Sequence, residues 1–524
     1  MSRNKRISKI KNSEHVYAVK IKTESNGLGV LKTMMLLFLI FSQAALLILS
    51  SLYLSGLFNW LILITAPLSL IAIVHALSSE YNGQAKATWV FFLFATFTFG
   101  YIFYFLSDKR VLFANGRKKY RKIFEQTKGL QKQNKIPEYK DKSVQASCNY
   151  LYNSGEFAAS ASSKAKYFPS GASFFDSVLE ELEKAKEFIF IEFYIFADGV
   201  LFDRVFDILQ RKVSEGVDVR IIYDDMGSHG TFKRKTKKKI RRAGIKLVTF
   251  NRMLPVFIIA LNIRDHRKIV VVDGKVAFTG GANLADEYIN EKRSHGYWKD
   301  TGIKIEGSAV DNFTKAFLMQ WKYLTKEEID YKAYLEKAEE FETDGVIVPF
   351  VTGPHYHASI AQNMMASVVA NATEKLFIMS PYFVPDETIT NLIINKARSG
   401  VDVRIVLPEV ADKKFVYIVS RNNAEKLIDH GVKVYTLKGS FVHSKVVMSE
   451  DAAIVGSINM DLRSFNQQFE SAVYTNQKSI LDEVEEDFDK TISYSTEVTK
   501  QTRRRNKFSN RVLAGLFNIV SPFM

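Results

Sequence analysis

A histidine and a lysine two residues apart occur twice in the chain, and this pairing is suited to phosphate chemistry. The first pair is His266 and Lys268, and the second is His443 and Lys445. Residues 269–272 are all isoleucine or valine, which predicts a strand whose side chains alternate. The histidine and lysine then face one side, about 7 Å apart. An imidazole can attack phosphorus or protonate a leaving oxygen, and an ammonium can neutralise developing charge.

A carboxylate and a run of small residues follow each pair. Four residues separate Lys268 from Asp273, and four separate Lys445 from Glu450. Small residues would let backbone N–H groups approach an anion, and a nearby asparagine could add side-chain donors. These positions are Gly280, Gly281 and Asn283 after the first pair, and Gly456, Ser457 and Asn459 after the second. A histidine on a strand is more often structural, but two copies of the whole pattern favour chemistry.

The elements that must position these pairs also occur twice. Continuous apolar runs alternate with stretches of helical spacing such as 173–186, which is typical of an α/β fold with buried strands. The first copy of three strands spans 188–196, 215–225 and 243–251, and the second spans 376–383, 399–408 and 430–438. Because the order and offset of the matches are nearly the same, we expect a duplicated α/β unit with two similar lobes.

Three apolar stretches in the first fifth of the chain predict a membrane anchor. They span 34–55, 60–77 and 87–106, contain no Asp, Glu, Lys or Arg, and approach the roughly 20 residues that cross a bilayer. Buried core helices and a cleaved signal peptide fit less well. Basic residues flank the anchor on both sides, which demands an even number of crossings. Either one of the three stretches is interfacial or re-entrant, or one flank breaks the rule, and we expect two spans with the remaining chain cytoplasmic.

Composition narrows the class of protein further. The net charge of +16 points to an anionic partner, either nucleic acid or an anionic membrane surface. The single cysteine, Cys148, excludes an internal disulfide framework and a cysteine-rich zinc site.

The two motifs resemble the phospholipase D superfamily, whose signature His-x-Lys-x4-Asp occurs twice, and within it the bacterial cardiolipin synthases. Further support comes from 262–274 (NIRDHRKIVVVDG), 279–283 (TGGAN), 298–301 (WKDT) and 456–470 (GSINMDLRSFNQQFE). The resemblance implies N-terminal transmembrane helices followed by two pseudo-symmetric α/β/α lobes with the active site between them. It also implies that two phosphatidylglycerol molecules become cardiolipin and glycerol.

The same resemblance assigns roles to residues. His266 would become covalently phosphatidylated, and His443 would act as acid and base, although a pseudo-symmetric pocket leaves this division open. Asp300 would orient His266, and Glu470 would orient His443. No metal or other cofactor is expected, because lysines and backbone donors carry the electrostatic work. Glu450 departs from the family's aspartate, which is a mild change if this carboxylate only holds the hairpin after the strand.

Other segments complete the expected organisation. We expect a membrane anchor with two or three transmembrane helices at 1–112, a linker at 113–165, phospholipase D-like lobes at 166–335 and 345–498, and a basic amphipathic tail at 499–524. The basic run 233–242 is either a solvated helix face or a site of attraction for anionic lipid headgroups. Tyr194 either lines the pocket or packs in the core.

Three other functions are compatible with parts of this pattern. A hydrolase releasing phosphatidic acid would share the pocket and use water as acceptor. A nuclease of the same fold would suit the positive charge, but it has no need of an apolar anchor, so we expect no nucleic acid. A catalytically silent membrane scaffold would not need two intact histidine–lysine pairs. The expected partners are phosphatidylglycerol and anionic membrane lipids.

Overall fold

The computed structural model describes most of the chain from the second apolar stretch onward. It describes residues 41, 42, 45 and 48 and the ranges 55–79, 83–96, 99–107, 114–131, 142–252, 263–356 and 359–502. The first apolar stretch, apart from those isolated positions, and the tail beyond 502 lie outside the described residues.

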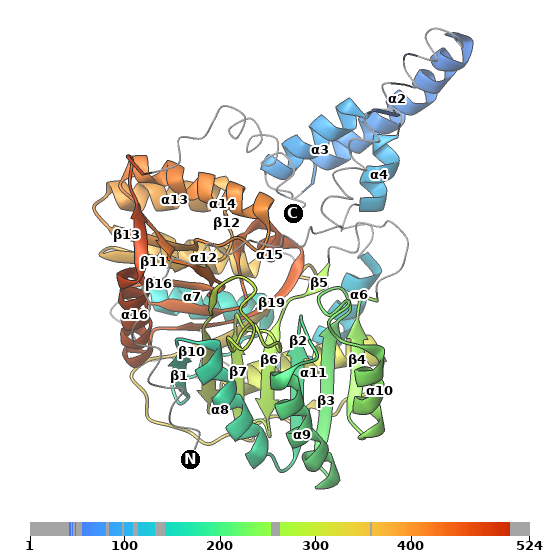
Figure 1. Ribbon diagram of the computed structural model, residues 1–524. Coiled ribbons are helices and arrows are strands. Elements are labelled where there is room, and N and C mark those ends of the chain that lie inside the picture. The colour runs from blue at the N-terminus through green and yellow to red at the C-terminus, as the bar shows by residue number, and fades with distance from the viewer. Residues whose placement is uncertain are drawn as a thin grey trace.

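Three apolar helices stand apart from the body of the protein (Figure 1). They are α2 (Ser55–Leu77), α3 (Gly83–Ala95) and α4 (Gly100–Ser107). In α2 the segment Trp60–Leu77 is long and apolar enough to cross a membrane, and only 22% of it is buried. The third apolar stretch, residues 87–106, is divided between α3 and α4 and does not form one continuous helix. His75 of α2 contacts the Tyr104 hydroxyl of α4 at 2.8 Å, which ties the helices together.

The first sheet of the body has seven strands. Its order is β1 (Lys164–Phe168), β9 (Gly302–Glu306), β7 (Val276–Gly280), β6 (Lys268–Val272), β2 (Phe188–Phe193), β3 (Asp218–Asp224) and β4 (Lys246–Phe250). Its helices are α8 (Gly171–Lys184), α9 (Val200–Ser214), α10 (Arg234–Arg242) and α11 (Val310–Thr325). Alternate residues of β6 pack into different cores, Val270 with α8 and α9, and Ile269 with α11. Both faces of the sheet are therefore buried, as the continuous apolar runs predicted.

The second sheet repeats this order. It runs β10 (Ile347–Thr352), β19 (Gln468–Thr475), β17 (Ala453–Gly456), β16 (Val446–Ser449), β11 (Lys375–Met379), β13 (Asp402–Pro408), β14 (Lys433–Leu437) and β20 (Ser495–Val498). Its helices are α12 (Ile360–Asn371), α13 (Glu387–Arg398), α14 (Lys414–Leu427), the short α15 (Leu462–Asn466) and α16 (Lys478–Ser493). Apart from β20, each strand takes the place of its counterpart in the first sheet.

Two short parallel strand pairs join the halves. The strand β5 (Arg264–Asp265) pairs with β19 of the second sheet, and β15 (Ser440–Val442) pairs with β8 (Tyr297–Lys299) of the first half. Each pair sets the strand before one motif histidine against a segment of the other half. Helix α11 also bridges the halves, because Asn312 donates to the Pro349 carbonyl of β10 at 2.8 Å.

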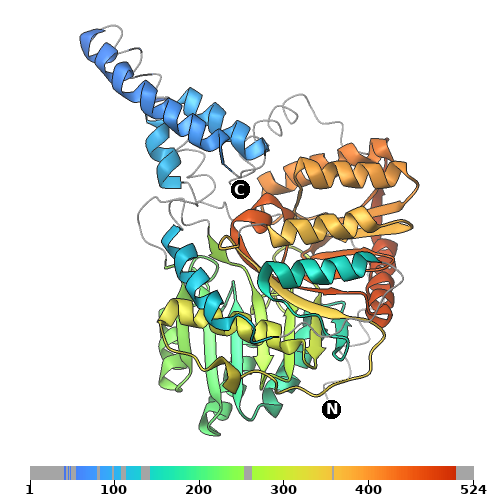
Figure 2. The same ribbon diagram turned by 180° about the vertical axis from the view of Figure 1, so that it is seen from behind.

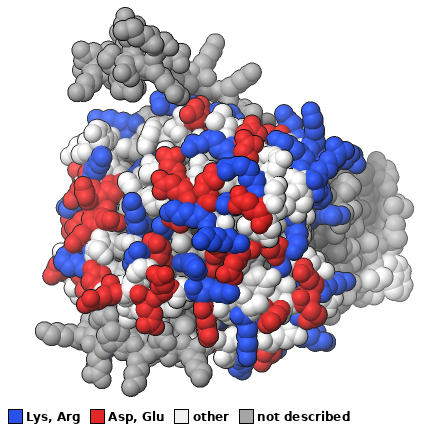
Figure 3. All heavy atoms as spheres, turned by 90° about the horizontal axis from the view of Figure 1, so that it is seen from below, with Lys and Arg blue, Asp and Glu red and all other residues white. Residues whose placement is uncertain are grey.

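Two further helices precede the first sheet in the chain. The helix α6 (Ala114–Thr127) leads from the apolar helices down to α11, and α7 (Lys142–Gly155) lies beside α12 (Figure 2). On the face turned away from the apolar helices, acidic and basic side chains are interspersed (Figure 3). The net positive charge is therefore not gathered there as one basic patch.

Candidate active site

The histidine of the first motif is fixed by the second half of the chain. His266 lies between β5 and β6, and its backbone N–H donates to the Phe469 carbonyl of β19 at 2.8 Å. Its Nδ1 contacts Glu470 Oε2 at 2.9 Å. Ser457 donates its hydroxyl to the same Glu470 oxygen at 2.5 Å. Backbone and side chain of the histidine are thus both held by β19.

The histidine of the second motif is fixed in the same way by the first half. The His443 N–H donates to the Lys299 carbonyl of β8 at 2.7 Å. Its Nδ1 contacts Asp300 Oδ2 at 2.7 Å. Both carboxylates are fully buried, whereas the two histidine side chains keep 9% and 10% exposure. Among the described residues no hydrogen bond occupies either Nε2, so that nitrogen is the one available for reaction.

The expected pairing of carboxylates with histidines was wrong. Asp300 was expected to orient His266 and Glu470 to orient His443, each within its own half. The structure has the reverse pairing, because β5 pairs with β19 and β15 pairs with β8. The strand that precedes each histidine, β5 or β15, is thereby placed beside the segment of the other half that contains the carboxylate. Neither half alone contains a complete histidine–carboxylate pair.

The lysine of each motif lies back against its own histidine. Lys268 Nζ donates to the His266 carbonyl at 2.7 Å, and Lys445 Nζ donates to the His443 carbonyl. Lys445 Nζ also lies 2.8 Å from His443 Nδ1. That nitrogen cannot donate to Asp300 and accept from a lysine at once, and the buried carboxylate is the stronger partner for its hydrogen. In the second motif this contact confirms the predicted placement of the histidine and lysine side chains on one side.

Burial shifts the titration of all these groups. Burial lowers the pKa of His266 well below its usual value, and the charges of Lys268, Lys445 and His443 lower it further. Burial likewise lowers the pKa of His443 to about 4 and raises that of Glu470 to about 8. Because His443 and Lys445 act on His266, the two half-sites lie within electrostatic range of one another. Both imidazoles are therefore neutral, and competent as nucleophiles or bases, before substrate arrives.

Burial also lowers the lysine pKa values. That of Lys268 falls to about 8 and that of Lys445 to about 7, although neighbouring carboxylates oppose the shift. Two partly neutralised ammonium groups regain full charge when an anion binds between them, because opposite charge favours the protonated form. The site is thus prepared for a phosphate anion.

Aromatic rings line each histidine. Tyr194 packs against His266 with ring centroids 4.9 Å apart, which decides between the two expected placements in favour of lining the site. Tyr288 and Trp298 pack against His443 at 5.3 and 5.4 Å. The sequence reasoning missed these two. Trp298 belongs to the stretch WKDT that supported the family resemblance, so the sequence could have pointed to it. No motif in the sequence included Tyr288.

The small residues do not offer free backbone donors, contrary to expectation. The N–H groups of Gly281, Gly456 and Ser457 donate to the backbone carbonyls of Thr301, Lys445 and Ser471. Gly281 instead makes room, since a Cβ there would lie 2.1 Å from Asp300 Oδ1. Gly280 would similarly place a Cβ 2.5 Å from the Thr301 carbonyl oxygen.

The two asparagines are buried beside the site, where Asn283 is already engaged. Its Oδ1 accepts from the Ile195 N–H at 3.1 Å, and its Nδ2 donates to the Tyr288 hydroxyl at 2.6 Å. Asn283 therefore holds Tyr288 against His443, and its Nδ2 keeps a second hydrogen that these two bonds do not use. The Oδ1 of Asn459 has no hydrogen-bond partner among the described residues.

Asp273 and Glu450 lie at the turns, away from the histidines. Asp273 accepts from the N–H groups of residues 186, 187 and 188 at 2.8 Å each. Glu450 accepts from the Thr373 N–H and hydroxyl and from the Lys375 N–H. Each carboxylate fastens the start of the neighbouring strand, β2 or β11. Both were expected among the catalytic residues, but among the described residues their hydrogen bonds are with these strand starts and not with the histidines. Glu450 thus lies where the hairpin interpretation of this carboxylate predicted.

Among the described residues no cluster of three or more His, Cys, Asp or Glu side chains could hold a metal ion. The arrangement is instead two neutral imidazoles, each fixed at Nδ1 by a buried carboxylate, with two lysines between the halves. Such a set can attack phosphorus with one ring and transfer protons with the other.

Comparisons with known proteins agree with this chemistry. A sequence model of the cardiolipin synthase, phospholipase D-like domain matches residues 178–321 and 365–492. A cardiolipin synthase of Alkalihalophilus pseudofirmus is 32% identical over 83% of this chain and 88% of its own length. A cardiolipin synthase of Listeria monocytogenes is 31% identical over 84% of this chain and 94% of its own length. An uncharacterised Streptococcus mutans protein is 37% identical over 72% of this chain and 82% of its own length.

A solved structure shares the fold. The phosphatidylserine synthase of Haemophilus influenzae matches with a TM-score of 0.56 at 14% identity, over 73% of this chain and all of that one. At this level of identity the likeness supports the mixed α/β fold alone.

Proposed function

The chain belongs to the cardiolipin synthase family of phospholipase D-like proteins, and from this premise we propose that it makes cardiolipin by phosphatidyl transfer. One phosphatidylglycerol donates its phosphatidyl group to a hydroxyl of a second, and glycerol leaves. The observation that carries this proposal is the crosswise pairing of His266 with Glu470 and of His443 with Asp300. It gives one phosphate two oriented imidazoles from opposite halves of a duplicated fold.

The first step forms a covalent intermediate on His266. Its Nε2 attacks phosphorus, the bond to the glycerol oxygen breaks, and His443 protonates that oxygen as it leaves. The new phosphohistidine ring carries a positive charge, which lowers the raised pKa of Glu470, and the ionised carboxylate then offsets that charge at Nδ1. His443 has a low pKa in the empty site, and the arriving phosphate anion raises it toward the value an acid needs.

The second step reverses the roles. His443, now neutral, removes the proton from a hydroxyl of the second phosphatidylglycerol. The oxygen attacks phosphorus, the bond to His266 Nε2 breaks, and cardiolipin is released. Lys268 and Lys445 face the transferred phosphate in both steps and offset the charge on its oxygens. No group is consumed, because the proton taken from the second lipid replaces the one given to glycerol.

We further propose that the two sheets with their helices form two pseudo-symmetric lobes that share this one site. The lobes correspond to the segments 166–335 and 345–498. The identical strand order of the two sheets and the two crossed strand pairs support this arrangement.

The lengths of the apolar helices and the basic residues on both sides of them suggest how the chain is arranged in the membrane. We propose two spans, one in 34–55 and one in α2, with α3 and α4 lying at the interface. By the usual rise of about 1.5 Å per residue, α3 and α4 are each too short to cross about 30 Å of hydrocarbon. Basic flanks on both sides then place the catalytic lobes in the cytoplasm. Anionic lipids at that surface supply the substrate.

The function is tested with purified full-length protein and phosphatidylglycerol labelled in either the headgroup glycerol or the acyl chains. The expected products are labelled free glycerol and acyl-labelled cardiolipin in equal amounts. Phosphatidic acid in place of cardiolipin would identify a hydrolase, and cleavage of DNA or RNA without lipid turnover would identify a nuclease. His266→Ala and His443→Ala are each expected to abolish transfer while leaving the protein folded.

A further inference from the structure

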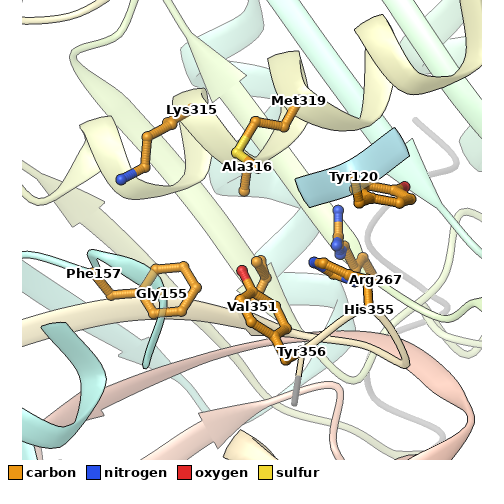
Figure 4. Close-up of a pocket in the computed structure, with 10 residues that line it drawn as sticks. All are labelled: Tyr120, Gly155, Phe157, Arg267, Lys315, Ala316, Met319, Val351, His355 and Tyr356. Carbon is orange, nitrogen blue, oxygen red and sulfur yellow. The ribbon is translucent and has the colours of Figure 1, made fainter. Parts of the chain in front are cut away.

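Helix α6 reaches from the apolar helices to the back of the site. It begins at Ala114, a few residues after α4 ends at Ser107, and packs on α11. Its Tyr120 is 2% exposed and enters a small pocket behind the first motif. Figure 4 shows the Tyr120 ring at one end of this pocket, beside Arg267 and His355, with Lys315 and Phe157 toward the other end.

The Tyr120 ring belongs to an aromatic stack that ends next to Glu470. It stacks on His355 with ring centroids 4.5 Å apart and an interplanar angle of 24°. His355 in turn stacks on Phe469 with ring centroids 5.2 Å apart and an interplanar angle of 16°. Tyr120 also contacts Phe469 directly at 5.5 Å, and on its other side it stacks on Tyr323 at 4.1 Å. Phe469 immediately precedes Glu470, and its carbonyl accepts the His266 N–H. The stack therefore supports the strand segment that holds His266.

A second connection runs through hydrogen bonds. The Tyr120 hydroxyl donates to Gln320 Oε1 of α11, and Gln320 Nε2 donates to Asp265 Oδ2 at 3.2 Å. Asp265 precedes His266 and lies in β5, the strand that pairs with β19. Tyr120 thus contacts β19 directly at Phe469, next to Glu470, and reaches β5 through Gln320 at Asp265, next to His266.

The buried guanidinium of Arg267 lies next to this aromatic stack and depends on the packing around it. It stands between His266 and Lys268 but points to the opposite face, where its guanidinium lies 5.0 Å from the Phe469 ring and 3.5 Å from Glu192. Its Nε and Nη1 have no hydrogen bonds among the described residues. A buried guanidinium with unsatisfied donors is costly, so the surrounding packing must hold it in place.

We propose that Tyr120 is a positioning residue for the His266–Glu470 pair, which makes α6 the element that couples the membrane anchor to one half-site. The inference rests on the proposed function. The equivalent pair, His443 and Asp300, is held differently. Lys299, which precedes Asp300, makes a buried ion pair of 2.7 Å with Asp487 of α16. Only the first half-site is therefore expected to respond to a change in α6.

The test compares Tyr120→Phe, Tyr120→Ala and the control Tyr331→Phe in the purified full-length protein with phosphatidylglycerol in mixed micelles. Tyr331 is a buried tyrosine in the short 3-10 helix that follows α11 in the chain, and its hydroxyl has no hydrogen-bond partner among the described residues. Tyr120→Phe removes one hydrogen bond, and we expect kcat to fall about fivefold. Tyr120→Ala also removes the stack, and we expect kcat to fall about 100-fold. KM should stay within twofold of the wild-type value, because substrate contacts are unchanged.

A double-mutant cycle keeps the proposal falsifiable if Tyr120→Ala fails to fold. Tyr120→Phe and Gln320→Leu act on one connection, so the double variant should lose no more kcat than the worse single variant. Unchanged kcat in Tyr120→Phe, or an equal loss in Tyr331→Phe, would overturn the positioning role. A wild-type protein that makes no cardiolipin would instead refute the proposed function, so the two failures are distinguishable.

Discussion

At the scale of single residues, the crosswise pairing gives each buried carboxylate a defined task. A carboxylate at Nδ1 fixes the tautomer that leaves Nε2 free to react, and it stabilises positive charge on the ring. Glu470 would then matter most when a bond forms between phosphorus and His266. Asp300 would matter most when His443 gives or takes a proton. A substrate that needs no protonation of its leaving group can separate these two tasks.

We therefore predict opposite responses of Glu470→Gln and Asp300→Asn to such a substrate. Phosphatidyl-p-nitrophenol has a leaving group that departs without an acid, so its burst of nitrophenol reports attack by the nucleophile alone. Glu470→Gln should slow the burst about 10²–10⁴-fold, by analogy with a triad whose orienting carboxylate is replaced. Asp300→Asn should keep a burst close to that of the wild-type protein. Loss of the burst in Asp300→Asn and its retention in Glu470→Gln would make His443 the nucleophile.

The two lysines predict how activity depends on pH. Lys445, with a pKa of about 7, and Lys268, with a pKa of about 8, lose charge as pH rises through that window. The phosphodiester does not titrate there, so kcat/KM should fall as pH rises above about 7. Glu470 also loses its proton near pH 8, but the resulting carboxylate stabilises charge on His266 and so opposes this fall.

Lys445→Arg tests whether the loss of charge on Lys445 causes this fall in kcat/KM, since a guanidinium stays charged at every accessible pH. The alkaline limb of kcat/KM should move from about pH 7 to about pH 8, even if the maximum rate is lower. A limb that stays near pH 7 in this variant would assign the titration to another group.

At the scale of elements, the turn after each motif strand shows how an apparent signature residue can be structural. Asp273 and Gly274 both have positive φ, 53° and 65°, as the tight turn between β6 and β7 requires. Asp273 uses this turn to cap the start of β2 with three hydrogen bonds. Glu450 caps β11 from a shorter turn with a longer side chain. The spacing of the motif therefore reflects strand length as well as catalysis.

Asp273→Ala should lower the free energy of unfolding by about 2–4 kcal/mol, because three N–H groups, of which that of Phe188 is buried, lose a charged partner. Glu450→Ala should cost about 1 kcal/mol or less, since its contacts are partly exposed to solvent. Urea unfolding of both variants would measure the difference. The folded fraction of each should retain transfer activity, and a folded but inactive Asp273→Ala would return this residue to the catalytic set.

The elements also mark the limit of what the sequence could predict. The six repeated strands were predictable because β-branched and aromatic runs recur in order, and β2 (Phe188–Phe193) and β11 (Lys375–Met379) lie where expected. The partner of each histidine was not predictable from proximity in the sequence. That partner is set by β5 with β19 and by β8 with β15, which are two or three residues long and join segments far apart. Short strands of this kind carry no periodicity to read.

At the scale of the whole molecule, the anchor and the body have separate surfaces. The exposed large apolar side chains are concentrated on α2, where Leu63, Ile64, Leu70 and Ile71 are each about 60% exposed. The body instead buries its apolar residues in two cores on the two faces of the first sheet. The helices α3 and α4 carry further exposed apolar side chains, such as Phe94, and an exposed apolar surface gathered on these three helices fits lipid around them. The side of the membrane on which the body lies then decides which leaflet supplies substrate.

The sidedness can be measured with a single introduced thiol, because the chain's own Cys148 is buried and burial raises its pKa to about 12. Such a thiol does not react with maleimides at neutral pH. Lys238→Cys places a reporter on the exposed side of α10, and Asn59→Cys places one just before the apolar segment Trp60–Leu77 of α2, between this segment and the proposed span in 34–55. In intact cells a membrane-impermeant maleimide should label Asn59→Cys and leave Lys238→Cys unlabelled until the cells are lysed. Labelling of Lys238→Cys in intact cells would place the catalytic body outside, and the substrate would then come from the outer leaflet.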